Sequence, residues 1–441
     1  MSKKIIVVGS GNAGLCAGLA ALEAGADVLM LEKAGRDLAG GNTKYTAGAM
    51  RFAYETSDAL LPLLTDPDDP RVAKSDFGSY GAEKFANDLL GFNEGQPLSV
   101  EQETLVDQSY DTMLWLAGHG VTFDPIYSRQ SFEKDGTFVF WGGLTLEAAN
   151  EGVGLFDMEL AAFEKLGGQI RYNAGVTDLV TKDGRVCGVT IGSEEILADA
   201  VVLACGGFEA NDKMRAEEFG PDWVHAKVRG TPNNTGDGLK MAWDLGAERY
   251  GRYNGCHATP MDLHMKNYGN LDMPHLARKN YRKICYFLGV MLNADGVRFV
   301  DEGINFRNYT YAQFGRAVLE QPGHFAWQVF DAKVSDLLYE EYRFEDAHFV
   351  EADTLDALTE LMEGVDGAAA RATLSEYNAH VDDKTPFDPT SLDGKGTHGL
   401  ALAKSNWAQR MDTPPFRAYP VTGGITFTLS LIHISEPTRP Y

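Results

Sequence analysis

The chain has 441 residues, 44% of them hydrophobic and 23% charged, which is typical of a folded soluble protein with two or three domains. The formal net charge of −24 disfavours nucleic acid and anionic membrane surfaces as partners. No apolar run reaches about 18 residues, so we expect no membrane span. We also expect no signal peptide, because the first predicted strand begins near Lys4. The five cysteines form no C-x-x-C pair, so we expect no metal site and a cytoplasmic protein.

The first 32 residues carry the pattern of a dinucleotide site. Apolar runs at residues 5–8 and 28–31 predict two buried strands. Between them a predicted helix opens on G-x-G-x-x-G, with Gly9, Gly11, Asn12, Ala13 and Gly14 as the expected contacts. Such a turn lets backbone approach a pyrophosphate, whose charge the helix N-terminus stabilises. Glu32 ends the second strand, where a carboxylate can accept hydrogen bonds from a ribose. The alternative is that these glycines serve a tight turn alone.

A second glycine-rich loop at residues 40–48 indicates FAD rather than NAD. It supplies backbone N–H groups and hydroxyls where an extended FAD would run, although a plain polar loop is the alternative. The expected FAD contacts in this part are Lys33, Gly41, Asn42, Thr43, Thr46, Ala47 and Gly48. The loop resembles that of the fumarate reductase/succinate dehydrogenase flavoproteins (the FAD-dependent oxidoreductase 2 family). No His near the loop matches the covalent attachment of succinate dehydrogenases, so the resemblance implies non-covalent FAD.

Three later segments match the same family in order. Val176 occupies the position that contacts adenine through its backbone. The segment 198–211 resembles the strand that ends in A-T-G-G-F, which makes Ala204 and Gly206 cofactor contacts, with Cys205 in place of Thr. The segment 231–247 resembles the helix start near the flavin, with Asp237 beside the ring. An Asp before an amphipathic run is also common as a helix N-cap, and this is the alternative.

The resemblance implies an α/β fold. Residues 1–254 would form a Rossmann-like FAD-binding domain with a parallel sheet and a β-rich part, and residues 255–425 an inserted α+β capping domain that binds substrate. Residues 426–428 would begin the return to the FAD domain. Residues 429–441 resemble translated sequencing-adapter read-through, so we expect a non-native tail and a missing C-terminal return segment. A genuine C-terminal strand is the other interpretation.

Three basic residues are the predicted catalytic and substrate-binding groups: Arg307, His257 and Arg282. Arg307 matches the family's proton-transferring Arg, although Asn308 replaces an Asp and the spacing from Glu302 is one residue longer. His257 matches a substrate-binding His, whereas the family's other substrate His falls on or near Phe427. Structural alternatives are an ion-paired or surface Arg307 and a buried, hydrogen-bonded His257.

Arg282 belongs to the densest basic segment of the chain, together with Arg278, Lys279 and Lys283. Cations of this kind can clamp carboxylates and stabilise developing negative charge. A solvated helix face is the alternative. Arg is a poor general base because its pKa exceeds about 12, so oxidation would need a proton relay, for which Glu302 is a candidate.

The closest resemblance is to the tricarballylate dehydrogenases, which convert tricarballylate to cis-aconitate. The stretches that carry it are residues 289–315, 393–409 and 414–428. The alternatives are a fumarate reductase or succinate dehydrogenase, a 3-ketosteroid dehydrogenase that uses tyrosines, and an inactive truncated fragment. No C-x-x-C-H haem motif is present, so electrons would pass to a separate partner. The resemblance implies a membrane-associated iron–sulfur protein in that role, and a small polycarboxylate as substrate.

Overall fold

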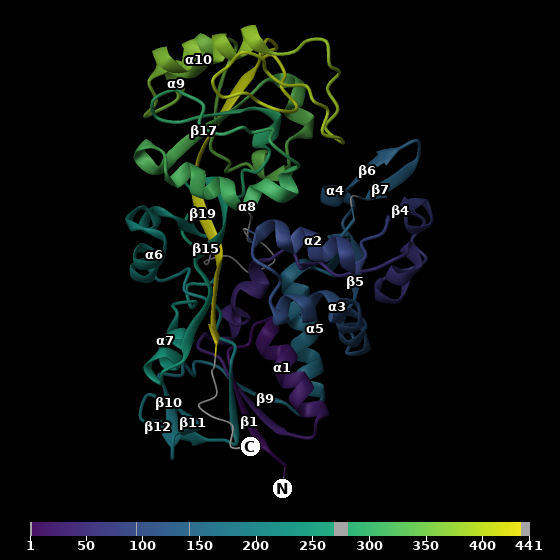
Figure 1. Ribbon diagram of the computed structural model, residues 1–441, viewed down its shortest axis with the longest axis vertical. Helices are drawn as coiled ribbons and strands as arrows, with labels where there is room; N and C mark the ends of the chain where they lie inside the picture. Colours follow the sequence, from purple (N-terminus) through teal and green to yellow (C-terminus); the bar gives the residue numbers. More distant parts are fainter. Residues whose placement is uncertain (1, 94, 141, 269–280, 434–441) are drawn as a thin grey trace. The chain divides into compact units, whose positions relative to one another are not determined.

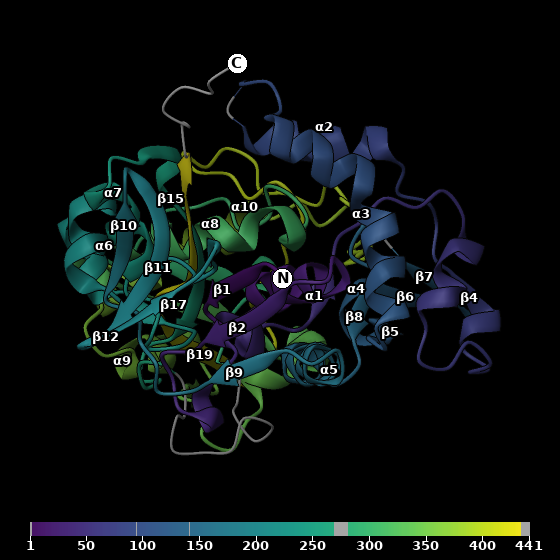
Figure 2. The same cartoon turned by 90° about the horizontal axis from the view of Figure 1, so that it is seen from below.

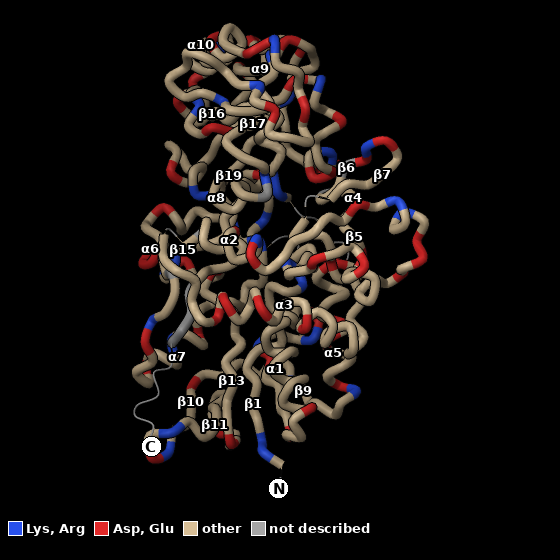
Figure 3. Tube along the Cα trace, turned by 45° about the vertical axis from the view of Figure 1, so that its right-hand side comes forward, with Lys and Arg blue, Asp and Glu red and all other residues tan. Residues whose placement is uncertain are grey.

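The computed structural model describes residues 2–93, 95–140, 142–268 and 281–433. The chain, drawn as a ribbon in Figure 1, divides into two compact units, Met1–Gly206 and Gly207–Tyr441. Each unit has its own hydrophobic cores. The division falls at the Gly206–Gly207 pair, and the predicted boundary at residue 254 stays a prediction. Acidic and basic residues lie along both units (Figure 3). Within the described ranges, no helix has the length and apolar character needed to cross a membrane.

A parallel four-stranded sheet forms the centre of the first unit, as predicted. Its order is β13-β1-β2-β9, and the strands are β1 (Lys4–Val8), β2 (Asp27–Leu31), β9 (Gln169–Arg171) and β13 (Ala200–Leu203). Helix α1 (Asn12–Glu23) connects β1 to β2 and packs on α5 (Glu151–Lys165) (Figure 2). A Cβ on Gly18 would lie 2.6 Å from the Phe163 ring, so glycine allows these helices to approach closely.

The rest of the first unit consists of small sheets and helices. The predicted β-rich part is an antiparallel sheet of β10 (Asp178–Lys182), β11 (Arg185–Ile191) and β12 (Glu194–Leu197). Two further sheets have three strands each. One contains β3 (Ala49–Met50), β5 (Phe123–Pro125) and β8 (Leu146–Ala148). The other contains β4 (Ser75–Asp76), β6 (Ser131–Lys134) and β7 (Thr137–Phe140). The other α-helices described in this unit are α2 (Ala82–Phe92), α3 (Val100–Gly118) and α4 (Tyr127–Gln130).

The second unit is built around one long strand, β19 (Phe416–His433), drawn in yellow in Figure 1. It pairs with β14 (Lys227–Val228), β15 (Glu248–Asp262), β17 (Phe325–Phe330) and β18 (Val350–Ala352), and β16 (Val290–Leu292) extends the sheet from β17. The α-helices described are α6 (Asp212–Phe219), α7 (Asp237–Asp244), α8 (Arg307–Leu319), α9 (Leu355–Leu361) and α10 (Gly367–His380).

Helix α8 lies tightly against the β15–β19 pair. A Cβ on Gly315 would come within 2.5 Å of the Ala258 carbonyl carbon, and one on Gly423 would collide with the Gly315 carbonyl oxygen. Glycine at both positions therefore brings helix and sheet backbones together. This close packing fixes the start of α8, which is Arg307, relative to the middle of β15, where His257 lies.

Candidate functional site

The predicted glycine turn is present between β1 and α1. Gly9 has a φ of 101°, a left-handed conformation that glycine adopts without strain. A Cβ on Gly9 would collide with the Ala204 carbonyl oxygen, and one on Gly14 would collide with that of Gly9. The backbone around Gly9 and Gly14 thus packs against the end of β13 and the start of α1 without space for a side chain at either glycine. This leaves the backbone N–H groups at the start of α1 at the carboxyl end of the parallel sheet, where α/β folds bind nucleotides.

The second glycine-rich loop lies against the first. Thr43 is part of a 3-10 helix (Gly41–Tyr45), and its Oγ1 accepts a hydrogen bond of 2.9 Å from the Asn12 backbone N–H. The Gly40 N–H donates to Ser10 Oγ at 3.2 Å. Thr46 Oγ1 donates to the Thr43 carbonyl at 2.9 Å. These bonds hold the two loops together, and the predicted cofactor contacts in them, including Ala13, Asn42, Ala47 and Gly48, stay predictions.

Glu32 is buried at the end of β2 and is already bound by protein donors. Its Oε2 accepts hydrogen bonds from the N–H of Ser10 (2.9 Å) and from Ser10 Oγ (2.5 Å), and its Oε1 accepts one from the Ala34 N–H (2.8 Å). An ionised carboxylate has about four acceptor positions. These bonds fix Glu32 and leave acceptor capacity, and its role toward a ribose stays a prediction. Lys33 follows it directly, with its side chain 3.2 Å from where a Cβ of Gly175 would lie.

The later predicted contacts extend this surface within the first unit. The Ala204 N–H donates to the Val8 carbonyl at 2.8 Å, and the Ala174 N–H donates to the Glu32 carbonyl at 2.8 Å. These bonds bring the segments that contain Gly206 and Val176 to the ends of β1 and β2. Asp237 belongs to the second unit, where it is the first residue of α7 and accepts a hydrogen bond from Thr235 Oγ1 at 2.9 Å. The N-cap of α7 is Gly236, so the N-cap alternative for Asp237 is wrong.

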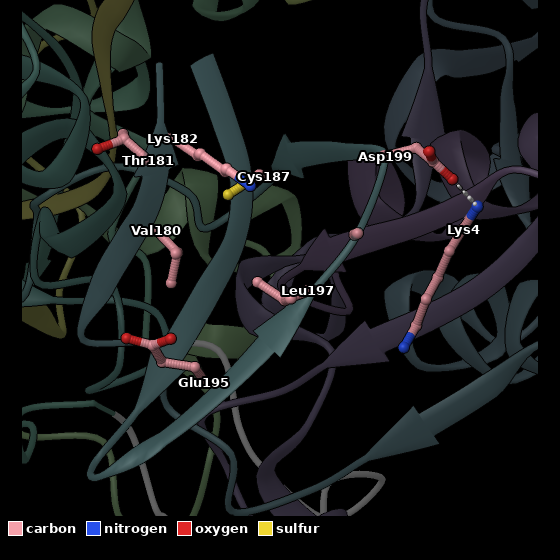
Figure 4. Close-up of a pocket in the computed structure, with 9 residues that line it drawn as sticks. Lys4, Val180, Thr181, Lys182, Cys187, Glu195, Leu197 and Asp199 are labelled. Carbon is pink, nitrogen blue, oxygen red and sulfur yellow. Dashed lines mark hydrogen bonds between the residues drawn. The ribbon is translucent and has the colours of Figure 1, made fainter. Parts of the chain in front are cut away.

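An open pocket of about 600 Å³ at the opposite end of β1 is a separate feature (Figure 4). It is lined by the β10–β12 sheet and by Lys4, whose backbone N–H donates to Asp199 Oδ2 at 2.7 Å. Ligands of parallel α/β sheets bind at the carboxyl ends of the strands. Because Lys4 is the first residue of β1 and Gly9 follows the last, this pocket does not belong to the dinucleotide surface.

Four basic residues gather in the second unit and are here called the basic cluster: Arg229, His257, Arg282 and Arg307. The charges of Arg229 and Arg282 both act on His257, and those of Arg307 and Arg282 both act on Tyr339. The structure thus brings the three predicted residues together, and it adds Arg229, which sequence reasoning missed.

His257 lies in the middle of β15, between two aromatic rings. Its ring stacks on Phe427 with 4.9 Å between centroids and meets Tyr311 edge-on at 5.0 Å. Within the described part of the chain, its buried Nδ1 has no hydrogen-bond partner. Burial, followed by the charges of Arg229 and Arg282, lowers the pKa of His257 to about 3. The imidazole is therefore neutral at physiological pH in a region of positive potential, and its predicted substrate-binding role stays a prediction.

Arg229 and Arg282 are held by different partners. Arg229 follows β14, and its Nε donates to Thr426 Oγ1 at 3.1 Å. Arg282 donates from Nη2 to Glu341 Oε1 at 2.9 Å, and its side chain is only 12% exposed. Arg282 is thus part of a buried ion pair and not of a solvated helix face.

Arg307 begins α8 and is buried, with its guanidinium 5.2 Å from the centroid of the Tyr339 ring. Burial raises the pKa of Tyr339, and the charges of Arg307 and Arg282 oppose that increase. The alternative of a surface Arg307 is wrong. The arrangement presents a permanently protonated group at one side of the basic cluster.

Two other residues named in the sequence analysis, Lys283 and Glu302, bind partners outside the basic cluster. Arg278 and Lys279 lie outside the described residues. Lys283 is fully buried, 3.7 Å from Asp262 Oδ2 and 2.5 Å from the Glu341 carbonyl. Glu302 is paired with Arg298 at 2.5 Å and accepts the Met291 N–H at 2.8 Å, and its candidate relay role stays a prediction. Within the described ranges, no group of His, Cys, Asp and Glu could hold a metal ion.

Comparison with known proteins identifies the family. A family model described as FAD binding domain matches residues 4–428. The chain belongs to this family of flavoproteins, which includes the fumarate reductases. The probable fumarate reductase Ifc3 of Shewanella frigidimarina is 28% identical over 98% of this chain and 66% of its own length. The chain therefore spans about two thirds of the length of such relatives.

Solved structures agree with this assignment. The open conformation of a flavocytochrome c3 fumarate reductase has a TM-score of 0.67 and 26% identity, and the match covers 98% of this chain and 68% of that one. A 3-ketosteroid Δ1-dehydrogenase from Sterolibacterium denitrificans reaches a TM-score of 0.70 at 17% identity, covering 98% of this chain and 89% of that one. The second match shows the shared fold alone. The predicted fold class and flavoprotein family are confirmed.

The residues of the first unit fit FAD, the cofactor of this family. A Cβ at Gly9 or Gly14 would fill the turn, and one at Gly11 would lie 3.4 Å from Thr43 Oγ1, so the two loops leave a backbone-lined surface of the kind that holds a pyrophosphate. Glu32 is fixed at the end of β2, where such sites contact a ribose. The glycine turn, the loop around Thr43 and the segment at Gly206 would hold the cofactor.

Proposed function

We propose that this chain is an FAD-dependent oxidoreductase acting on a C–C bond next to a carboxylate. The observation that carries the proposal is the buried, neutral His257, which has an unpartnered Nδ1 and lies in the positive potential of Arg229 and Arg282. Positive charges removed from water are stabilised by an anion with which they can form hydrogen bonds. A substrate carboxylate bound at the basic cluster would supply both the negative charge and the hydrogen-bond partner.

The basic residues then divide into two roles. Arg229, His257 and Arg282 would bind and orient the carboxylate, and their positive potential would stabilise negative charge that develops on it during reaction. Arg307, at the side of Tyr339, would transfer the proton at the carbon next to the carboxylate. The bound FAD supplies the chemistry of hydride acceptance and donation. Because Arg307 is always protonated, its chemistry favours proton donation, that is, reduction of a C=C bond.

Oxidation would require that Arg307 pass a proton to another group. Tyr339 and Glu341 are candidates, since Tyr339 interacts with Arg307 and Arg282 and Glu341 accepts a hydrogen bond from Arg282. The finer prediction that the reaction converts tricarballylate to cis-aconitate remains a candidate, beside fumarate reduction and succinate oxidation. The ketosteroid alternative has one supporting observation, which is that Tyr311 and Tyr339 both border the basic cluster. An iron–sulfur electron partner likewise stays a prediction.

The experiment that tests the proposal is anaerobic absorption spectroscopy of the purified chain with bound FAD. Bleaching of the oxidised flavin by tricarballylate or succinate, or reoxidation of dithionite-reduced flavin by an unsaturated acid, is the expected result. A 3-ketosteroid that bleaches the flavin where no acid has an effect would select the alternative. Fully loaded flavin that responds to no acid would reject the proposal.

Arg307→Gln tests the proton-transfer role. We expect retention of the flavin and loss of turnover by about 10² to 10⁴-fold, the usual contribution of a positioned acid. Arg343→Gln, at an exposed position of the same unit, is the control and should leave turnover unchanged. Full turnover by Arg307→Gln would remove Arg307 from the reaction.

A further inference from the structure

A β-bulge shapes the middle of the β15–β19 pair. His257 lies opposite Phe427 and Ala258 lies opposite Ile425, so Thr426 is an extra residue on β19. Bulges redirect side chains and are frequent beside active sites. Here the bulge places Phe427 directly on His257, while its neighbour Thr426 accepts the hydrogen bond from Arg229. The bulge therefore brings both the ring of Phe427 and the guanidinium of Arg229 close to His257.

Phe427 is an apolar side chain that this unit leaves partly uncovered. It is 41% exposed, although its ring packs at an interplanar angle of 27° on His257. Stacking covers one face of a ring, so the exposed fraction belongs to the rest of the ring. Tyr311 meets His257 edge-on, and the three rings form an aromatic wall beside the basic cluster.

The wall and the basic cluster differ in what they can bind. Arg229 and Arg282 suit a carboxylate, whereas Phe427 offers no hydrogen-bond donor to a second one. A carboxylate pressed against Phe427 would lose water without gaining a partner, which is unfavourable. A flat apolar group there would instead stack on the ring.

We infer that Phe427 is the specificity-determining residue of this site, and that the substrate is an α,β-unsaturated monocarboxylate with an aryl group, such as a cinnamate. This inference rests on the proposed function. The carboxylate would bind at the basic cluster and the aryl group on Phe427. The C=C bond between them takes up a hydride at one carbon and a proton at the other, while reduced FAD is oxidised. The product is the saturated 3-arylpropanoate.

Binding of the saturated acids provides a test that does not need turnover. Titration calorimetry on the FAD-loaded chain should give 3-phenylpropanoate at least about tenfold tighter binding than succinate, a ratio in the range that one apolar contact can provide. Phe427→His, which replaces the ring with one that offers hydrogen-bond donors, should reverse this order. Phe427→Leu, which keeps the position apolar, should weaken 3-phenylpropanoate without improving succinate. Leu392→Ala removes an exposed apolar side chain elsewhere in the unit and should change neither affinity.

Turnover separates failure of this inference from failure of the proposed function. Reoxidation of dithionite-reduced flavin should be faster with cinnamate than with fumarate, and Phe427→His should shift the ratio of kcat/KM toward fumarate by about tenfold or more. Preference of the wild-type chain for fumarate or a tricarboxylate, or an unchanged ratio in Phe427→His with full flavin content, would overturn the inference and leave the proposed function standing. A chain that neither binds nor reduces any of these acids would overturn both.

Discussion

At the scale of single residues, the first unit contains an acid that its surroundings keep neutral. Glu159 of α5 is fully buried, and its Oε1 accepts a hydrogen bond from Cys16 Sγ at 3.7 Å. Asn12 Oδ1, 3.3 Å from Cys16 Sγ, is an alternative acceptor for the same thiol hydrogen and lies at the start of α1. Burial raises the pKa of Glu159 to about 8. Ionising this residue would leave a charge inside the core, so its protonated form stabilises the fold.

We predict that Glu159 makes stability depend on pH. Its pKa is higher in the folded state than the ordinary value of 4.5, so its contribution is complete below pH 4.5 and is lost as pH rises to about 8. The loss amounts to a few kcal/mol, at about 1.4 kcal/mol per pKa unit. Glu159→Gln should flatten the profile of unfolding free energy, measured by urea denaturation from pH 5 to 9. Glu164→Gln, an exposed acid of the same helix, is the control, and equal slopes in all three proteins would contradict the prediction.

A second prediction concerns His257. Because its pKa is lowered to about 3, it stays neutral between pH 5 and 8, and it lacks the usual histidine titration near 6.5. The affinity for a carboxylate ligand should therefore show no inflection near pH 6.5 caused by His257. The shape of its pH profile should be the same in the wild-type chain and in His257→Gln. Calorimetric titrations at half-unit intervals of pH would measure this. An inflection that the substitution abolishes would mean that His257 becomes charged in the complex.

At the scale of elements, the β1–α1 turn depends on glycine for space as well as for backbone conformation. Gly14→Ala is expected to destabilise the chain and reduce FAD content, because the added Cβ would overlap the Gly9 carbonyl oxygen. Gly91→Ala is a matched control, because this residue lies in α2 with no heavy atom within 4 Å of an added Cβ. That change should stabilise by about 0.5–1 kcal/mol, the ordinary effect of replacing helical Gly by Ala. Thermal unfolding and flavin content would measure both, and wild-type flavin content in Gly14→Ala would contradict the expectation.

The elements that sequence reasoning predicted are those specified by local pattern. Residues 4–32 contain a strand, a turn, a helix and a strand in immediate succession. The pattern of apolar residues and the spacing of the glycines were therefore sufficient to place these elements. The basic cluster needed contacts between distant segments. Arg229 and Thr426 are 197 residues apart, and the register of β15 on β19 decides that Phe427 covers His257. The buried ion pairs of Glu302 and Lys283 could not be predicted either, because charge alone does not show whether a side chain faces a site or a buried partner.

At the scale of the whole molecule, the two compact units predict an uneven response to FAD. The predicted cofactor contacts, apart from Asp237, lie in the first unit. A ligand at 100 times its Kd stabilises the structure that binds it by about 2.7 kcal/mol. Hydrogen exchange should therefore show a larger increase in protection for β1 and α1 than for α10 when FAD is added to the cofactor-free chain. An equal increase in both would show that the units open together.

Because several strands pair with β19, this strand also limits which mutations the protein can tolerate during evolution. A residue inserted in the strand would turn every later side chain to the other face and break its pairing with β15. A substitution at Phe427 leaves the backbone ladder intact, because the hydrogen bonds of a sheet do not involve side chains. Under the proposed role of Phe427, new substrate preferences would be accessible through single codon changes in this strand, and a small library randomised at residues 426–428 would sample them on an unchanged scaffold.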